Sequence, residues 1–309
     1  MGRVTQDMKR NEWLDIAKGI TIILMVVGHS NIPEFATHFI YAFHMPLFFF
    51  ASGWCTNWDK YSFIIFFSRK FKTLIIPFLV YSMILALLLY FYVPNMWMGT
   101  GNLLKNGWGG FALWFVPVLF ASQMIGRLIM SCKNTLLQNM MAVMMAVIGG
   151  IMSFYRVEMV WQMSSCFYGA FLIILGSKLK CFKKNIDSPS IWQIIFGGII
   201  VLIISSYYCI DMASNNIFPV IPKTVSALSG ILFVFSLSSF ISKKYKYCSL
   251  ILQNIGKETY IVVAFSQIII VLVNEYFTTN FVVKYFILCV GLVAIRYIKD
   301  LVILHLQRK

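Results

Sequence analysis

Charged residues are scarce in this chain of 309 residues. Asp, Glu, Lys and Arg together make up 12% of it, and only 11 residues are acidic. Soluble domains carry about 25% charged residues, so this composition leaves too few charges to cover a water-exposed surface. The scarcity of charge therefore excludes an ordinary soluble protein.

Long polar segments are also missing, whereas long apolar stretches are frequent. Hydrophobic residues make up 60% of the chain and the mean hydropathy is +0.79. A transmembrane helix needs about 20 apolar residues. Stretches of about this length occur at residues 13–30, 36–56, 73–93, 110–131, 138–154, 159–177, 190–210, 222–242, 258–276 and 281–304. We therefore predict an all-α, polytopic integral membrane protein whose residues 1–309 form one membrane-embedded domain, with no soluble domain.

The positive charge is unevenly distributed along the chain. Its 26 Lys and Arg residues give a net charge of +15. Most of them lie in alternate connections between the apolar stretches, as in the cytoplasmic loops of membrane proteins. This bias predicts about ten spans with both termini in the cytoplasm, in a cell (plasma or inner) membrane. The basic residues then meet anionic lipid headgroups, so the charge requires no nucleic-acid partner.

Several other features are missing. The seven cysteines have no metal-type spacing, and we predict no metal. No small-x-small cleavage site follows the first apolar stretch, which we expect to be an uncleaved anchor. No clear internal repeat is visible, and this weakens a transporter interpretation. Because no soluble domain is predicted, the chemistry of the protein is expected inside the membrane or at its faces.

The first apolar stretch carries ionisable residues, each of which costs about 2.5–3.5 kcal/mol at the bilayer centre. With about 100° per residue, Asp15, Lys18 and His29 project into one sector about 60° wide. Lys18 and His29 are about 16 Å apart along the helix axis. One interpretation is an interfacial ion pair with a separate histidine at the helix end. The other is a polar cavity with Asp15 and Lys18 as a charge network at its entrance, and three polar residues on one stripe favour it.

Further candidates follow in the second stretch and behind it. His44 stands near the start of the second stretch, and we expect it close to His29 on the outer side, with His38 in the loop before it. Arg69 and Lys72 then form a basic cytoplasmic segment. Ordinary positive-inside bias explains this segment; the alternative is a contact with an anionic donor such as coenzyme A, whose phosphates suit the planar fork of arginine.

Several runs of residues in these stretches resemble a known family, the integral-membrane acyltransferase family 3, particularly its fucose 4-O-acetylase-like branch. The most specific matching runs are Leu14–Gly19 with Gly28–Ser30, and Phe43–Phe49 with Ser52 and Gly53. Weaker matches follow in the same order at residues 69–77, 113–117 and 255–259. The resemblance implies about ten membrane helices. It also implies transfer of an acyl group, commonly acetyl from cytoplasmic acetyl-coenzyme A, to a hydroxyl of a sugar or glycan.

The family signature is a basic residue, ten positions and then a histidine, which corresponds to Lys18 and His29. Relatives usually have arginine first; lysine keeps the charge but lacks the bidentate fork. Relatives often carry a second histidine where this chain has Ser266, which leaves His44 as the expected second imidazole.

The resemblance therefore implies an O-acyltransferase with a histidine at its centre. His29 would take a proton from the acceptor hydroxyl or briefly carry the acyl group. His44 would orient His29 or donate a hydrogen bond to the developing oxyanion. The donor-binding candidates are Arg69, Lys72, Ser52 and Trp114. The alternatives for the last two are close helix packing for Ser52 and interface anchoring for Trp114.

The expected donor is acetyl-CoA or another acyl-CoA, as a substrate and not as a permanently bound cofactor. The expected acceptor is a sugar or cell-surface glycan, so the reaction would be a polysaccharide modification such as O-acetylation. The acceptor's identity, and action as a homo-oligomer or beside a glycan-synthesis machinery, stay open. The competing function is a multi-pass transporter or flippase for a glycan precursor or a small polar solute.

Overall fold

The structure, a computed structural model, describes residues 12–29, 32–96, 112–182, 186, 189–277 and 280–307. The helices of its first half are α1 (Glu12–Gly28), α2 (Glu34–Tyr41), α3 (His44–Cys55), α4 (Phe63–Lys70), the π-helix η1 (Phe71–Ile75), α5 (Ile76–Tyr92), α7 (Phe115–Met130) and α8 (Thr135–Phe154). Those of its second half are α9 (Cys166–Lys178), α11 (Ile191–Tyr207), α12 (Val220–Lys244), α13 (Lys246–Lys257), α14 (Thr259–Tyr276) and α15 (Phe281–Gln307). Short 3₁₀ segments are η2 (Pro94–Met96), η3 (Ala112–Trp114), η4 (Val160–Ser165) and η5 (Leu179–Phe182). The predicted all-α class is confirmed for the described residues, which contain no strand.

Seven segments of the described chain are helical, long and apolar enough to cross a membrane. They are Glu34–Cys55, Phe63–Tyr92, Ala112–Met130, Thr135–Phe154, Val160–Cys181, Val220–Lys244 and Thr259–Tyr276. The other three predicted stretches correspond to α1, α11 and α15, of which α11 is a shorter apolar helix. The count of about ten spans and the cytoplasmic termini therefore stay predictions, and residues 1–11 and 308–309 lie outside the described residues.

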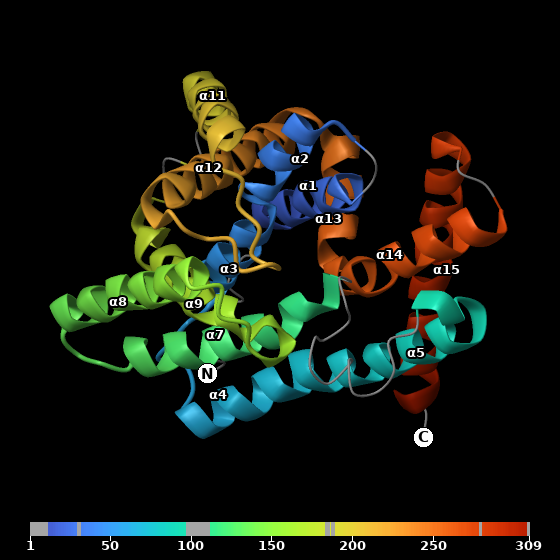
Figure 1. Ribbon diagram of the computed structural model, residues 1–309, viewed down its shortest axis with the longest axis horizontal. Coiled ribbons are helices and arrows are strands. Elements are labelled where there is room, and N and C mark those ends of the chain that lie inside the picture. Colours follow the sequence, from blue (N-terminus) through green and yellow to red (C-terminus); the bar gives the residue numbers. More distant parts are fainter. Residues whose placement is uncertain are drawn as a thin grey trace, which may run out of the picture.

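Some helices cross steeply, as α14 and α15 do, whereas α5, α7 and α8 run in roughly the same direction (Figure 1). α4, η1 and α5 follow one another as a nearly continuous rod beside α7, while α8 and α9 lie against the other side of α7. α1 packs against α12 and α13 and is crossed by α13, and α15 stands at the edge of the molecule beside α14. This arrangement brings α1, α3, α4, α7 and α14 around a common space.

The second apolar stretch is divided into two helices. α2 ends at Tyr41, and α3 begins at His44 after a two-residue turn. His38 lies inside α2, with its Nε2 3.5 Å from Oε1 of Glu34, so its predicted position in a loop is wrong. The helix starts earlier than expected because Pro33 occupies the N-cap position and the acidic Glu34 opens the first turn.

Two glycines fix the position of α3 against α9. A Cβ atom on Gly53 would overlap the carbonyl oxygen of Ile173, and one on Gly176 would overlap that of Phe50. The two backbones are therefore in direct contact, as is common where small residues face each other between membrane helices.

A cluster of buried aromatic rings holds the other side of α3. The ring of Trp13 on α1 lies 5.9 Å from that of Trp54 on α3 and 5.0 Å from that of Phe235 on α12, measured between centroids. All three side chains are at most 6% exposed. Since α3 is held by α1, α9 and α12 together, the side chains on its remaining face have fixed positions.

Candidate functional site

Two histidines lie at one end of α1 and α3, each with its Nδ1 bound to the main chain. Nδ1 of His29 is 2.8 Å from the carbonyl oxygen of Met25, and Nδ1 of His44 is 3.0 Å from that of Ile40. A carbonyl oxygen only accepts hydrogen bonds, so each Nδ1 carries the proton and donates it. In the neutral ring, Nε2 then has a free lone pair and can accept a proton.

The same tyrosine ring touches both imidazoles. The ring centroid of Tyr41 is 5.8 Å from that of His29 and 4.9 Å from that of His44. His29 is exposed, whereas His44 is buried. Sequence reasoning missed Tyr41, although its position three residues before His44 was a usable signal. Because Nε2 of neutral His44 carries no proton, the expected donation to an oxyanion requires His44 to be protonated.

Asp15 and Lys18 form a pair near the opposite end of α1. Nζ of Lys18 lies 3.3 Å from Oδ1 of Asp15, and the Asp15 side chain is only 4% exposed. Their spacing of three residues places both on one face of the helix. Lys18 also borders a cavity.

This cavity has a volume of about 520 Å³ and lies between α1, α3, α4 with η1, α7 and α14. Four cations contribute to its lining: Lys18, Lys60, Arg69 and Lys70. The apolar part of its wall includes Phe48, Leu74, Phe115, Val116, Leu119 and Val263. No carboxylate is among the described lining residues, so an anionic group beside a long apolar group is the ligand that fits.

Three of the lining cations have aromatic neighbours in place of carboxylates. Lys60 and Arg69 lie over the ring of Tyr61, at 5.4 and 4.6 Å from its centroid. Lys70 lies 5.4 Å from the ring centroid of Phe66. Within the described residues none of these three cations forms an ion pair with protein. Their charge is therefore available to a bound anion.

The four donor-binding candidates divide into two pairs. Arg69 and Ser52 line the cavity, whereas Lys72 and Trp114 do not. Lys72 is exposed and lies in the π-helix that begins at Phe71, whereas Arg69 lies in the last turn of α4. Trp114 is 5% exposed and packs in the hydrophobic core.

Ser52 has a hydrogen-bond partner that sequence reasoning missed. Nε2 of Gln123, on α7, donates to Oγ of Ser52 over 2.5 Å. The Gln123 residue is 3% exposed. The available signal was a lone amide side chain in the apolar segment 115–130, because polar groups at membrane depth need a partner or a role.

A tyrosine hydroxyl ties the π-helix to α14. The hydroxyl of Tyr260 donates to the carbonyl oxygen of Leu74 over 2.7 Å, and both residues line the cavity. π-Helical turns are frequent at functional sites. Here the turn follows directly after Arg69 and Lys70, so this bond helps to set where the two cations stand.

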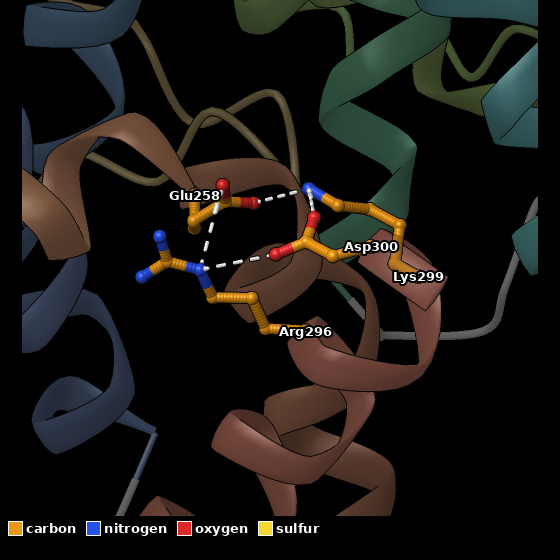
Figure 2. A network of polar contacts seen from close by, with 4 residues as sticks. All are labelled: Glu258, Arg296, Lys299 and Asp300. Atoms are coloured by element: carbon orange, nitrogen blue, oxygen red, sulfur yellow. Dashed lines mark hydrogen bonds and ion pairs between the residues drawn. The ribbon is translucent and has the colours of Figure 1, made fainter. Parts of the chain in front are cut away.

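The start of α14 is also tied to α15 by a charge network (Figure 2). Glu258 directly precedes the lining residues of α14, and its Oε2 lies 2.5 Å from Nζ of Lys299. Nε of Arg296 lies 3.8 Å from Oε1 of Glu258 and 3.9 Å from Asp300. The carboxylate of Glu258 thus sits between two cations of α15.

The two halves of the candidate site are separate. Neither histidine lines the cavity, and Lys18 and His29 lie about 16 Å apart along α1. Ser266, where relatives were expected to carry a second histidine, is fully buried, and its Oγ has no partner among the described residues. The described residues contain no group of three or more His, Cys, Asp or Glu side chains that could hold a metal ion. The arrangement offers an anion site at one end and proton acceptors at the other.

Comparison with known proteins identifies the family. A family model described as an acyltransferase domain, that of acyltransferase family 3, matches residues 11–299. No curated protein and no solved structure matches the chain. The match spans nearly the whole sequence, including both histidines and the cavity. The chain therefore belongs to acyltransferase family 3 and is a membrane acyltransferase.

Proposed function

We propose that the protein transfers an acetyl group from cytoplasmic acetyl-coenzyme A to a hydroxyl of a sugar or cell-surface glycan. One observation carries this proposal. A cavity with an unneutralised cationic part and an apolar part lies beside α1, the helix that His29 directly follows. The runs of sequence described above resemble the fucose 4-O-acetylase-like branch, and this resemblance supports O-acyl transfer to a sugar in the cell membrane.

Acyl-coenzyme A fits the cavity by its chemistry. It carries phosphates at one end and a long uncharged arm that ends in the thioester. Lys60, Arg69 and Lys70 supply the cations for the phosphates, and Arg69 alone has the fork that binds two phosphate oxygens at once. The apolar walls exclude water from the arm. Since the anion site and His29 lie at different depths, an extended donor is required to connect them.

The proton chemistry follows from the histidine tautomer. With Nδ1–H bound to Met25, Nε2 of His29 takes the proton of the acceptor hydroxyl while the hydroxyl oxygen attacks the thioester carbonyl. The carbon–sulfur bond breaks, and the leaving thiolate receives the proton from His29. An acyl group carried briefly on Nε2 is the alternative route, and both routes need this atom free. Asp15 and Lys18 organise the inner entrance of the path.

The direct test uses the purified protein in lipid vesicles. Labelled acetyl-coenzyme A is supplied with a panel of candidate sugars and glycans, and the acylated product is identified by mass spectrometry. We expect stable O-acetylated product from wild-type protein and none from heat-treated protein.

The same vesicles distinguish the competing function. If labelled sugar accumulates inside them without acylation, the protein is a transporter and the proposal is wrong. If labelled acetyl-coenzyme A yields no acylated product although another acyl carrier does, the assignment of the donor is wrong.

A further inference from the structure

The bond between Gln123 and Ser52 joins two helices at a place where polar groups are costly. Gln123 lies in an apolar segment of α7 and is 3% exposed. Its Oε1 has no hydrogen-bond partner among the described residues. Amide groups at membrane depth are expensive to bury and are retained for a structural or functional role. An apolar side chain would pack at this position without that cost.

The direction of the bond determines whether the hydroxyl proton of Ser52 is free for a further hydrogen bond. The amide N–H of Gln123 donates, so Oγ of Ser52 accepts. No other hydrogen bond of the Ser52 side chain occurs in the described part of the chain, and Ser52 lines the cavity. Its hydroxyl proton is therefore free to be donated to a ligand in the cavity.

The depth of Ser52 indicates which ligand atom it meets. On α3, Ser52 lies one turn inside Cys55, where the helix ends, and eight residues from His44. Eight residues correspond to about 12 Å along a helix. Ser52 is thus near the phosphate-binding cations and far from the histidines. A donor whose phosphates met these cations would pass Ser52 with its middle part and not with its thioester.

We propose that Gln123 is a positioning residue that holds Ser52 so that its hydroxyl donates to an amide carbonyl in the arm of coenzyme A. The inference rests on the proposed donor. It assigns an arm subsite to the cavity and gives Ser52 a role distinct from that of Arg69: Arg69 binds the phosphates, and Ser52 binds the arm.

Two ligands separate these roles by calorimetry on the full-length protein in detergent. Coenzyme A has both the phosphates and the arm, whereas adenosine 3′-phosphate 5′-diphosphate keeps all the phosphates and lacks only the arm. We expect Ser52→Ala to weaken coenzyme A binding about 2- to 12-fold, the range of one neutral hydrogen bond, and to leave the binding of the armless nucleotide unchanged. Gln123→Met should show the same selectivity. Ser52→Thr keeps a hydroxyl and should bind both ligands like wild type.

Every other outcome overturns either the proposed arm contact or the proposed donor. If Ser52→Ala loses the same affinity for both ligands, Ser52 shapes the phosphate site. If its affinity for coenzyme A is unchanged, Ser52 does not bind the arm of coenzyme A. Either result overturns the inference. A thermal melt of each variant shows that the comparison concerns folded protein. If wild-type protein binds neither ligand, the proposed donor itself fails, which is a distinguishable result.

Discussion

Gly19 and Gly256 face each other where α1 crosses α13. A Cβ atom on Gly256 would stand 2.9 Å from the backbone nitrogen of Gly19 and would overlap the carbonyl oxygen of Asp15. A Cβ atom on Gly19 would overlap the carbonyl oxygen of Leu252. The two backbones are in direct contact beside Lys18 on one helix and just before α14 on the other. This contact therefore sets the distance between two walls of the cavity.

Alanine at either glycine should separate the two helices. Gly19→Ala and Gly256→Ala both place a methyl group against backbone, which cannot move aside as a side chain does. We expect each to destabilise the protein by about 1–3 kcal/mol, the usual range for overpacking, and to lower the melting temperature in detergent. Gly198→Ala on α11 is the matched control, because its Cβ would meet only side-chain atoms of Phe233 at 3.5 Å or more. Equal melting of Gly256→Ala and Gly198→Ala would contradict the described contact.

Two basic residues three positions apart should differ in donor binding. Arg69 lines the cavity and Lys72 does not. Arg69→Ala should weaken coenzyme A binding about 10- to 150-fold, as expected for the loss of a charge-assisted hydrogen bond. Lys72→Ala removes the same charge from the same segment and should change the affinity little. Calorimetry on both variants checks the pair, and a larger loss in Lys72→Ala would show that the cavity is not the donor site.

The hydroxyl of Tyr260 should matter for the position of the π-helix. Tyr260→Phe removes the donor to the carbonyl oxygen of Leu74, at a cost of about 0.5–1.5 kcal/mol. We expect weaker coenzyme A binding together with a lower melting temperature. Tyr247→Phe on α13 is the control, because Tyr247 is 84% exposed. Wild-type affinity in Tyr260→Phe would mean that η1 holds its position without this bond.

The pair of Glu258 and Lys299 should couple α14 to α15. Their side chains are 22% and 30% exposed, so solvent screens the pair and its contribution is modest. A double-mutant cycle with Glu258→Gln and Lys299→Met should give a coupling energy of about 0.2–1 kcal/mol in detergent at low salt. The coupling should shrink as salt is added. Purely additive effects at low salt would show that the pair drawn in Figure 2 carries no stability.

The helices were largely predictable from the sequence, because a long apolar segment in a bilayer must satisfy its backbone hydrogen bonds internally and therefore forms a helix. Each of the ten predicted stretches contains a helix or pair of helices. The break at Ala42 and Phe43, which divides the second stretch, was not predictable, because it depends on how α2 and α3 pack. The position of His38 inside α2 was not predictable either, because it depends on the start of that helix at Glu34.

The candidate site was predictable where one helix carries it. Asp15 and Lys18 pair as their spacing predicts. Contacts between helices distant in sequence were not predictable: Gln123 meets Ser52 across 71 residues, and Tyr260 meets Leu74 across 186. Lys72 does not line the cavity, and its role in donor binding stays a prediction. The roles of the histidines stay predictions until they are measured.

The central claim is that donor binding and proton transfer occur at opposite ends of one helix. The most direct test measures both quantities on His29→Ala: acetyl transfer from labelled acetyl-coenzyme A, and affinity for coenzyme A. We expect transfer to fall about 10²- to 10⁴-fold, the usual contribution of a positioned base, while the affinity stays within about twofold of wild type because the cavity is intact. Wild-type transfer by folded His29→Ala would contradict the central claim.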